Sequence, residues 1–522
     1  MAPTASTRAR AAALFAKPGT YTPEVACLAA GLLLPLAFAP WHWPVLAWVA
    51  LIPLFLAADS PRPGIRLRRG LLFGLGLFGL GLHWLLPTIH QFGNMPLALA
   101  VPTWVLLVAY CALYPAVFAL VGGWVALRPG LRLGLALPLL WTGLEGVRGL
   151  AFTGFPWLGL GASQVGGPLD GLIPVVGSQG TGLAVALLNG WLLLAGRALA
   201  RGRGRSAAAW AAGGAALVAA AVAVGPVPWT APRGPGLEAA LVQGAVPQRL
   251  KWDPEQRRET MARYRRLTLK HLDADVVVWP ETSLPLLAGQ ARGYLEELGA
   301  AARARGTTLL VGAPQRRWVD GEKHYFNAAV TLGAGGGERY RKRHLVPFGE
   351  YVPLRGLLFF AERFVPGGGA FRPGQSPAPL AVGRHRAGIA ICYEDAFARE
   401  VAATVRAGAD LLVNMTNDAW FGRSIGPDQH AQLARVRARE LGRPILRVAN
   451  TGLTFAADHR GRVLGALPRH RPGVQRVRIQ PRSGATPYQG LSRGWLLGGI
   501  LLGIGVLAAA GWRGPLPGRR RG

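Results

Sequence analysis

The chain has 522 residues, of which 51% are hydrophobic and only 16% are charged, and its formal net charge is +32. Soluble domains carry about 25% charged residues, so this composition excludes an ordinary soluble protein over the full length. So large a positive charge would suggest nucleic-acid binding in a soluble protein, but no nucleic-acid module is recognisable. Arginines scattered along the chain instead suit a surface that faces anionic lipid, and we expect no nucleic-acid partner.

Long apolar segments predict a polytopic α-helical membrane region. No Lys, Arg, Asp or Glu occurs from Leu71 to Leu127 or from Gly171 to Gly196, and roughly 20 apolar residues suffice to cross a bilayer. In the fifth predicted helix, Glu145 and Arg148 share a face and are able to pair. We expect eight membrane helices in all, near residues 24–40, 42–58, 71–90, 96–126, 133–149, 172–196, 206–225 and 494–512.

Basic residues in the loops indicate how these helices are oriented. The loops around Trp41 and Asn94 contain none. The positive-inside rule then places both termini in the cytoplasm and residues 226–493 outside it. The basic residues lie at the termini and in alternate loops, at Arg8, Arg10, Lys17, Arg62, Arg66, Arg68, Arg69, Arg128, Arg132, Arg197, Arg201, Arg203, Arg205, Arg513, Arg519, Arg520 and Arg521.

The region outside the membrane reads as a layered α/β domain. Short apolar runs typical of buried strands alternate with helical stretches, and this alternation predicts sheets covered by helices. In such domains functional side chains gather at strand ends. The expected strands are 239–243, 276–279, 308–311, 328–332, 388–392, 411–415 and 445–448, and the expected helices are 254–272, 291–305, 399–407 and 428–441.

One cysteine is a candidate nucleophile. Cys27 and Cys111 lie in apolar runs, where a thiol is usually a small core side chain. Cys392 ends the expected strand 388–392 and is followed by two acids, an unusual context for a core residue, although an inert buried thiol is a plainer interpretation. A nucleophilic thiol needs a base and a group that stabilises negative charge.

Two further residues supply those needs. Glu281 follows a strand that Pro280 ends, and a carboxylate in a partly apolar site is a suitable base for the thiol proton. Lys342 precedes the apolar turn 345–348, which draws it toward the core, where its amine would stabilise an oxyanion beside the Tyr393 N–H. Taken alone, Glu281 is also compatible with a surface turn and Lys342 with a solvated basic face.

Together and in this chain order, the three residues resemble the Glu–Lys–Cys triad of the nitrilase superfamily. The surrounding motifs narrow the resemblance to the apolipoprotein N-acyltransferases, the membrane branch of that superfamily. This similarity covers nearly the whole chain and implies a nitrilase-like α-β-β-α sandwich outside the membrane. The motifs are TGFPWL (153–158), LKWD (250–253), WPET (279–282), HLVPFGE (344–350), ICYE (391–394) and NDAWFG (417–422).

The resemblance also assigns roles. Cys392 would carry the acyl group, with Glu281 as general base and Lys342 as oxyanion partner. Supporting residues would be Glu350, Tyr393 and Glu394. Trp252 and Trp420 would contact substrate, although packed core tryptophans are as reasonable from sequence alone. No metal and no cofactor are expected, and His430 is interpreted as a helix residue because no second ligand accompanies it at metal spacing.

The implied function is a two-step acyl transfer that completes lipoprotein maturation. A phospholipid would acylate Cys392, and the N-terminal amine of a diacylglyceryl-cysteine lipoprotein would accept the acyl group. The implied location is the bacterial inner membrane, with the catalytic domain 226–493 periplasmic between a seven-helix domain (1–225) and a last helix with a basic cytoplasmic tail (494–522). The alternative is a membrane-tethered nitrilase-type amidohydrolase. A degenerate membrane scaffold and a transporter are weaker alternatives. A further hypothesis makes 357–369 a hinged flap at the lipid interface, and a buried loop is an equally reasonable interpretation.

Overall fold

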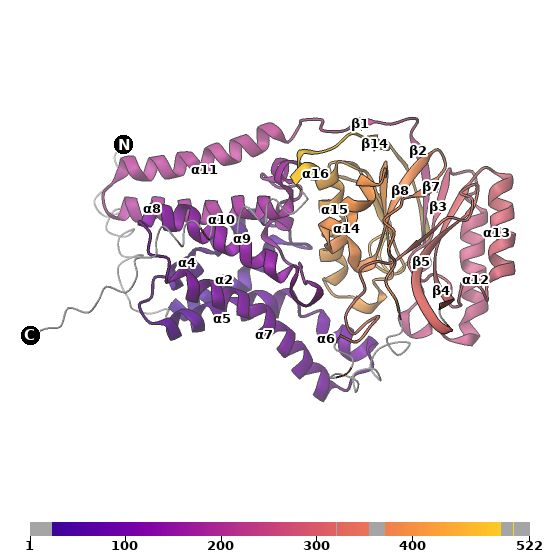
Figure 1. Ribbon diagram of the computed structural model, residues 1–522, viewed down its shortest axis with the longest axis horizontal. Coiled ribbons are helices and arrows are strands. Elements are labelled where there is room, and N and C mark those ends of the chain that lie inside the picture. The colour runs from indigo at the N-terminus through magenta and orange to yellow at the C-terminus, as the bar shows by residue number, and fades with distance from the viewer. Residues whose placement is uncertain (1–22, 320, 354–355, 357–370, 492–504, 506–522) are drawn as a thin grey trace, which may run out of the picture. The chain divides into compact units, whose positions relative to one another are not determined.

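The structure is a computed structural model that describes residues 23–319, 321–353, 356, 371–491 and 505 (Figure 1). It divides into two compact units, one formed by 1–83, 105–226 and 493–522 and the other by 84–104 and 227–492. We describe each unit by itself. The hypothesised flap in 357–369 lies outside the described residues, and so does the predicted last helix, except Gly505.

The first unit is helical. Its elements are α2 (Pro23–Leu33), η1 (Leu34–Ala37), η2 (Pro44–Leu46), α3 (Ala47–Ala50), α4 (Ile52–Ala57), α5 (Pro63–Gly81), most of α7 (Leu97–Gly122), α8 (Pro129–Leu131), η4 (Arg132–Ala136), α9 (Leu137–Arg148), η5 (Ala151–Thr153), η6 (Leu160–Gln164), η7 (Asp170–Leu172), α10 (Ile173–Ala200) and α11 (Gly204–Val224). Figure 1 shows α10 and α11 running side by side. Apolar helices therefore occur at each of the first seven predicted spans.

Length and composition give a stricter test of these helices. Among the described residues, three helices are long and apolar enough to cross a membrane, namely Leu97–Gly122, Asp170–Ala200 and Gly204–Val224. A fourth span results if the bent pair Pro63–Gly81 and Leu85–Phe92 counts as one. Several apolar helices are thus present, while the number eight stays a prediction.

Glycines let α5 pack closely against two neighbouring helices. A Cβ at Gly31 of α2 would lie 2.1 Å from the Phe73 carbonyl oxygen of α5. A Cβ at Gly74 of α5 would lie 2.6 Å from the Ala112 Cα of α7. Helices in membranes associate mainly through such close packing, because lipid provides no hydrophobic driving force between them.

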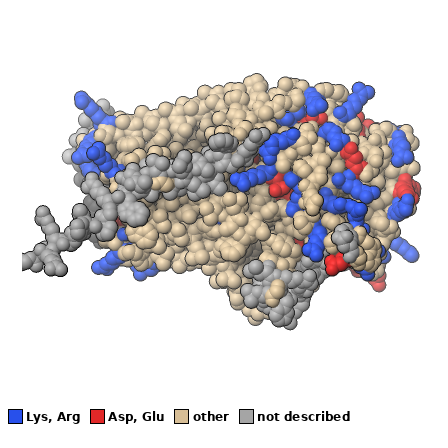
Figure 2. Space-filling model, in the orientation of Figure 1, with Lys and Arg blue, Asp and Glu red and all other residues tan. Residues whose placement is uncertain are grey.

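Loops that were predicted to share one side of the membrane meet through ion pairs. Asp59 pairs with both Arg132 and Arg197, and Glu24 pairs with Arg68 and Arg69. On the face drawn in Figure 2, Lys and Arg gather at one end of the helical unit, whereas its flank carries almost none. Three loops that contain basic residues therefore lie at one end of this unit.

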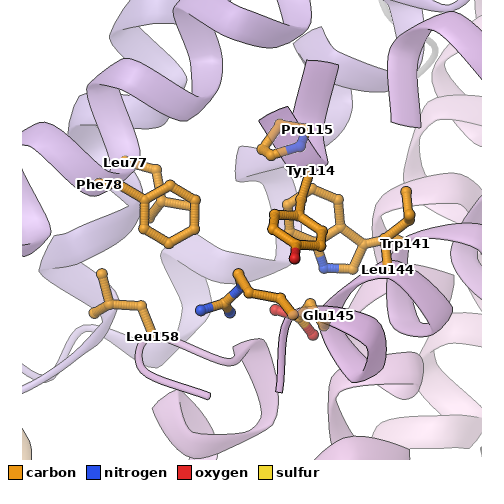
Figure 3. Close-up of a pocket in the computed structure, with 9 residues that line it drawn as sticks. Leu77, Phe78, Tyr114, Pro115, Trp141, Leu144, Glu145 and Leu158 are labelled. Atoms are coloured by element: carbon orange, nitrogen blue, oxygen red, sulfur yellow. The ribbon is translucent and has the colours of Figure 1, made fainter. Parts of the chain in front are cut away.

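A narrow, mostly apolar pocket that also contains Glu145 and Arg148 lies between α5, α7 and α9 (Figure 3). Glu145 and Arg148, which the sequence allowed to pair, form no ion pair within the described chain. Arg148 Nη1 instead donates to the carbonyl oxygens of Phe155 (2.7 Å) and Trp157 (2.6 Å). Glu145 accepts from the Leu160 N–H (3.0 Å). Arg148 thus holds the TGFPWL loop, and Glu145 holds Leu160 just after it. The cavity of about 10 Å³ is no larger than one water requires.

The second unit contains two six-stranded sheets. In one sheet the order is β12-β11-β10-β9-β8-β7 and in the other β13-β2-β3-β4-β5-β6, with parallel pairing within β8–β9–β10 and within β2–β3–β4. The strands are β2 (Leu237–Gln243), β3 (Val276–Val278), β4 (Thr308–Val319), β5 (Glu322–Gly333), β6 (Arg339–Arg341), β7 (Leu380–Val382), β8 (His385–Ile391), β9 (Leu411–Thr416), β10 (Ile445–Ala449), β11 (Phe455–Ala457), β12 (Val463–Ala466) and β13 (Gly473–Ile479). A small pair joins β1 (Ala231–Pro232) to β14 (Arg482–Ser483).

Three hydrophobic cores stack these sheets into four layers. One core joins the two sheets through residues such as Val278 and Ile389. A second core joins the β2–β5 face to α12 (Pro254–Leu269) and α13 (Arg292–Ala304). A third joins the other sheet to α14 (Ala398–Arg406), α15 (Gly426–Leu441) and α16 (Pro487–Leu491). Figure 1 shows helices on the outer face of each sheet, so the layered α/β prediction is confirmed.

A short segment from the apolar part of the sequence belongs to this second unit. It contains α6 (Leu85–Pro87), η3 (Thr88–Phe92) and the start of α7. Trp84 donates to Gln429 Oε1 of α15 (3.0 Å), and its ring meets Phe421 at 4.7 Å. Phe92 lies against Gly422. The segment therefore packs beside the NDAWFG loop.

The close packing of α5 can be tested by substitution. Gly74→Ala should lower the free energy of unfolding by about 2 kcal/mol, because the new methyl group overlaps the α7 backbone. Gly79→Ala on the same helix is the control, since a Cβ there has no neighbour within 4 Å. Thermal unfolding in detergent measures both. Equal melting temperatures for the two variants would contradict the packing described.

Candidate active site

The predicted triad residues come from strand ends of both sheets. Glu281 follows β3 of one sheet, and Cys392 follows β8 of the other. Carboxyl ends of parallel strands are where functional groups of α/β domains gather. Lys342 comes directly after β6, the edge strand beside β5. Since the two sheets pack face to face, these ends meet.

Lys342 lies between two carboxylates. Its Nζ is 2.9 Å from Glu350 Oε2 and 3.8 Å from Glu281 Oε1. The Asn327 amide joins the carboxylates by donating to Glu281 Oε1 (2.7 Å) and Glu350 Oε1 (2.9 Å). The Lys342 side chain is 1% exposed, so these contacts are shielded from water. The result is a rigid buried cluster of alternating charge.

The electrostatics keep Lys342 cationic. Burial disfavours its charge, but the carboxylates of Glu350 and Glu281 outweigh burial and raise the pKa of Lys342 above its ordinary value. A permanent ammonium beside the thiol is suited to stabilise a developing oxyanion. Lys342 is thus poorly suited to act as a proton shuttle at neutral pH.

The charges of Glu281 and Lys342 both act on the Cys392 thiol. Burial raises the pKa of the Cys392 thiol well above its ordinary value, the Glu281 charge raises it further, and the Lys342 charge opposes both effects. The thiol also has a side-chain hydrogen bond with Thr416. Cys392 adopts φ +53°, a left-handed conformation that costs a non-glycine residue about 1–3 kcal/mol. Such strain is typical of a residue whose position the surrounding structure dictates.

A second lysine, which the sequence analysis did not assign, faces the same site. Lys251 of the LKWD motif is buried, and its Nζ donates to the Glu281 carbonyl oxygen (3.4 Å). Burial lowers the pKa of Lys251 to about 8, although the charges of Glu281 and Cys392 act in the opposite direction. The site therefore holds a permanent cation and one that titrates near neutral pH.

Glu394 fixes the end of β8 to the loop that follows β6. Its carboxylate accepts from Tyr340 Oη (2.9 Å), from the Arg343 N–H (2.6 Å) and from the Ile391 N–H (2.7 Å). It also accepts from the N–H of His344 (3.1 Å). Burial raises the pKa of Glu394 to about 7 against these donors, which favour the carboxylate. Glu394 thereby holds the Cys392 and Lys342 segments together.

Of the remaining predicted residues, Tyr393 follows Cys392 directly in the chain. The Tyr393 ring packs edge-on against Phe397 at 4.9 Å. Trp252 follows η8 (Gln248–Leu250) and is 52% exposed. This exposure excludes the alternative that Trp252 is a packed core side chain. Trp420 lies half-buried in η12 (Ala419–Phe421). An exposed indole and a half-buried one are both available to a ligand.

Sequence reasoning missed three groups that touch Glu281. Asn327 and Lys251 are two, and the third is the Asn417 N–H, which donates to Glu281 Oε2 (2.9 Å). Lys251 and Asn417 stand in quoted motifs, so their position beside Trp252 and Asp418 was a usable signal. Asn327 interrupts the apolar stretch Phe326–Val330, where an amide needs buried partners.

Comparison with known proteins decides the family. The model described as "Apolipoprotein N-acyltransferase N-terminal domain" matches residues 30–191, and the model described as "Carbon-nitrogen hydrolase" matches residues 238–488. The apolipoprotein N-acyltransferase of Photobacterium profundum is 39% identical over 479 residues, covering 88% of this chain and 89% of that protein. That of Methylococcus capsulatus is 40% identical over 494 residues, covering 91% and 94%. The chain belongs to the apolipoprotein N-acyltransferase family.

Among solved structures, an amidase of the nitrilase superfamily from Nesterenkonia AN1 aligns over 51% of this chain and 97% of its own length, at 20% identity and a TM-score of 0.38.

Membership of the apolipoprotein N-acyltransferase family confirms the predicted enzyme class, an N-acyltransferase of lipoprotein maturation, and a nitrilase-like catalytic fold. It also identifies the chain as a bacterial membrane protein. The amidohydrolase alternative is not favoured.

Removing the Glu394 carboxylate should destabilise the catalytic unit. Glu394→Ala leaves three backbone N–H groups and the Tyr340 hydroxyl without this acceptor, at a cost of at least about 2 kcal/mol in free energy of unfolding. Glu400→Ala is the control, because that carboxylate pairs with Arg343 at a half-exposed position and should matter by less than about 1 kcal/mol. Chemical denaturation of both variants measures the difference. A Glu394→Ala protein as stable as the control would contradict the bracing role.

Proposed function

We propose that this N-acyltransferase moves a fatty acyl group from a phospholipid to the N-terminal amine of a diacylglyceryl-cysteine lipoprotein, through a thioester on Cys392. The observation that carries the proposal is the cluster in which Glu281 and Lys342, from one sheet, face the Cys392 thiol at the end of a strand of the other sheet. In this scheme Cys392 is the nucleophile, Glu281 the general base and Lys342 the oxyanion partner.

In the first half-reaction, Glu281 accepts the thiol proton as the Cys392 sulfur attacks the ester carbonyl carbon of the phospholipid. The Lys342 ammonium stabilises the negative oxygen of the tetrahedral intermediate. Collapse of the intermediate breaks the ester C–O bond. Glu281 returns its proton to the departing oxygen, so a lysophospholipid leaves with a free hydroxyl group and a thioester remains.

In the second half-reaction, the neutral α-amine of the lipoprotein attacks the thioester carbonyl. Glu281 accepts a proton from the attacking nitrogen, the C–S bond breaks, and the sulfur recovers a proton from Glu281. The products are an amide and free enzyme. An α-amine has a pKa of about 8, so a large neutral fraction is present near pH 8. Amide resonance makes the amide more stable than the thioester and drives the cycle forward.

The neighbouring residues have supporting roles in this proposal. Glu350 fixes Lys342, and Glu394 fixes the segments that carry Lys342 and Cys392. Tyr393 shapes the site and contributes its backbone N–H to the oxyanion. Trp252 and Trp420 contact the lipid substrates, for which an amphipathic indole ring is well suited.

The membrane arrangement is part of the same proposal. Residues 1–225 form a seven-helix membrane domain, 226–493 the periplasmic catalytic domain, and 494–522 a last helix and cytoplasmic tail. The basic loops gathered by Asp59 at one end of the helical unit support a common cytoplasmic side. Both lipid substrates then reach the thiol from the outer leaflet of the inner membrane.

Mass measurement of the intact protein tests the thioester. The Cys27→Ala/Cys111→Ala variant, incubated with phospholipid and no acceptor, should gain the mass of one acyl group, because Cys392 is its sole thiol. Adding Cys392→Ala should abolish the adduct. An acceptor peptide with a diacylglyceryl-cysteine terminus should discharge it.

Two outcomes would count against the scheme. An adduct that persists in the triple variant would show acylation elsewhere. Release of free fatty acid at the same rate with and without the acceptor would indicate a hydrolase. That result would favour the amidohydrolase alternative.

The oxyanion role of Lys342 has its own test. Lys342→Met should slow thioester formation by about 10²–10³-fold, the usual loss when one oxyanion donor is removed. Arg372→Met is the control, because Arg372 is a neighbouring surface cation whose charge has no described contact with the triad. Single-turnover acylation rates give the comparison, and an unchanged rate for Lys342→Met would refute the assignment.

A further inference from the structure

Four ionisable side chains are buried together behind Cys392, outside the cluster that holds Lys342. They are Asp395 of η11 (Cys392–Ala396), Asp418 before η12, His430 of α15 and Arg447 of β10. Each side chain is at most 1% exposed. We call these residues the buried quartet. The reaction steps described above use none of them.

Ion pairs close the buried quartet into a ring. His430 Nδ1 lies 2.9 Å from Asp418 Oδ1, and His430 Nε2 lies 3.0 Å from Asp395 Oδ1. Arg447 reaches the other oxygens of the same carboxylates, at 2.8 Å from Asp418 Oδ2 and 3.1 Å from Asp395 Oδ2. Two cations thus face two anions with no exposure to solvent.

The ring keeps His430 protonated. Burial and the Arg447 charge oppose protonation, but Asp395 and Asp418 outweigh them and raise the pKa of His430 to about 9. An imidazolium has a proton on each ring nitrogen, so Nδ1 and Nε2 are both donors. Nε2 is therefore a donor to any acceptor in reach.

The acceptor in reach of His430 Nε2 is the backbone carbonyl oxygen of Cys392. His430 Nε2 lies 3.1 Å from the Cys392 carbonyl oxygen. Asn414 Nδ2 donates to the same oxygen at 3.3 Å, and Arg447 Nη1 orients Asn414 by donating to its Oδ1. The Cys392 carbonyl oxygen therefore accepts hydrogen bonds from two donors, His430 and Asn414, which the buried quartet holds in place.

This oxygen belongs to the peptide group whose N–H is that of Tyr393. In a planar trans peptide the C=O and N–H bonds point in opposite directions, so fixing the oxygen fixes the direction of the N–H. Hydrogen bonding at the oxygen also polarises the amide and strengthens its N–H as a donor. The left-handed φ of +53° at Cys392 shows that the backbone of the residue carrying this oxygen is itself strained.

We propose that the buried quartet is a positioning device that clamps the peptide between Cys392 and Tyr393 and aims the Tyr393 N–H at the oxyanion. The inference rests on the proposed thioester function and adds positioning residues to it. Buried ion pairs contribute little net stability compared with well-packed apolar groups, so a positional role accounts better for four buried charges.

Substitutions at His430 separate the donor from the charge. Asn at this position retains a polar contact toward Asp418 but is too short to reach the Cys392 oxygen, whereas Gln retains a neutral donor near the Nε2 position. His430→Asn should slow single-turnover thioester formation about 100-fold, the scale of loss for a misplaced reacting group. His430→Gln should lose about tenfold. KM for the phospholipid should change by less than about twofold in both, because the peptide acts on the transition state.

Asp428→Asn is the matched control. Asp428 lies on the same helix and pairs with Arg469 (2.9 Å), but it has no contact with Cys392. This variant should lower the melting temperature without slowing acylation. His430→Gln combined with Asp395→Asn restores charge balance to the buried quartet. The pair should recover stability while its acylation rate stays below that of the wild type.

Each outcome decides one point. If His430→Asn does not fold, His430→Gln carries the test alone. An acylation rate within about twofold of wild type in the folded variant overturns the proposal, as does a rate loss that the charge-balanced pair fully recovers with stability. If the wild type itself forms no thioester, the proposed function fails instead, so the two failures are distinguishable.

Discussion

The buried ammonium of Lys342 between Glu350 and Glu281 is the interaction on which the site depends. An unpaired charge in this position would be strongly destabilising, so the two carboxylates stabilise the fold around Lys342. Asn327 joins them, and Glu394 ties the Lys342 segment to the end of β8. The ends of two separate sheets are thereby fixed to one another at the thiol.

The ionisable groups of the site differ in how the structure shifts their pKa values. The carboxylates raise the pKa of Lys342, burial lowers the pKa of Lys251 to about 8, and burial raises the pKa of the Cys392 thiol well above its ordinary value. A resting thiol is less exposed to stray alkylation and oxidation than a resting thiolate. Behind it, the buried quartet adds no net charge and leaves this balance undisturbed. Thioester chemistry in lipid surroundings depends on such control, because water reaching the acyl-enzyme would turn transfer into hydrolysis.

Much of the fold followed from the sequence. All seven expected strands and all four expected helices of the catalytic unit occur, because buried parallel strands form continuous apolar runs. Several strands were not predicted because they are short, namely β6, β7, β11 and β12. The edge strand β13 was not predicted either, because its side chains, like those of β12, are largely exposed or polar. The candidate residues Glu281, Lys342 and Cys392 were identified through motifs. Asn327 and the buried quartet were not, because their roles depend on contacts between residues up to 52 apart in sequence.

The mechanism depends on a Cys392 thiol that rests neutral in a site whose Glu281 and Lys342 charges are already paired. The most direct measurement is the pH dependence of Cys392 alkylation by iodoacetamide in the Cys27→Ala/Cys111→Ala protein, free of substrate. We expect slow alkylation at neutral pH and an apparent pKa above the ordinary cysteine value of about 8.5. Rapid alkylation with an apparent pKa below about 7, the signature of a thiolate–cation pair, would contradict it.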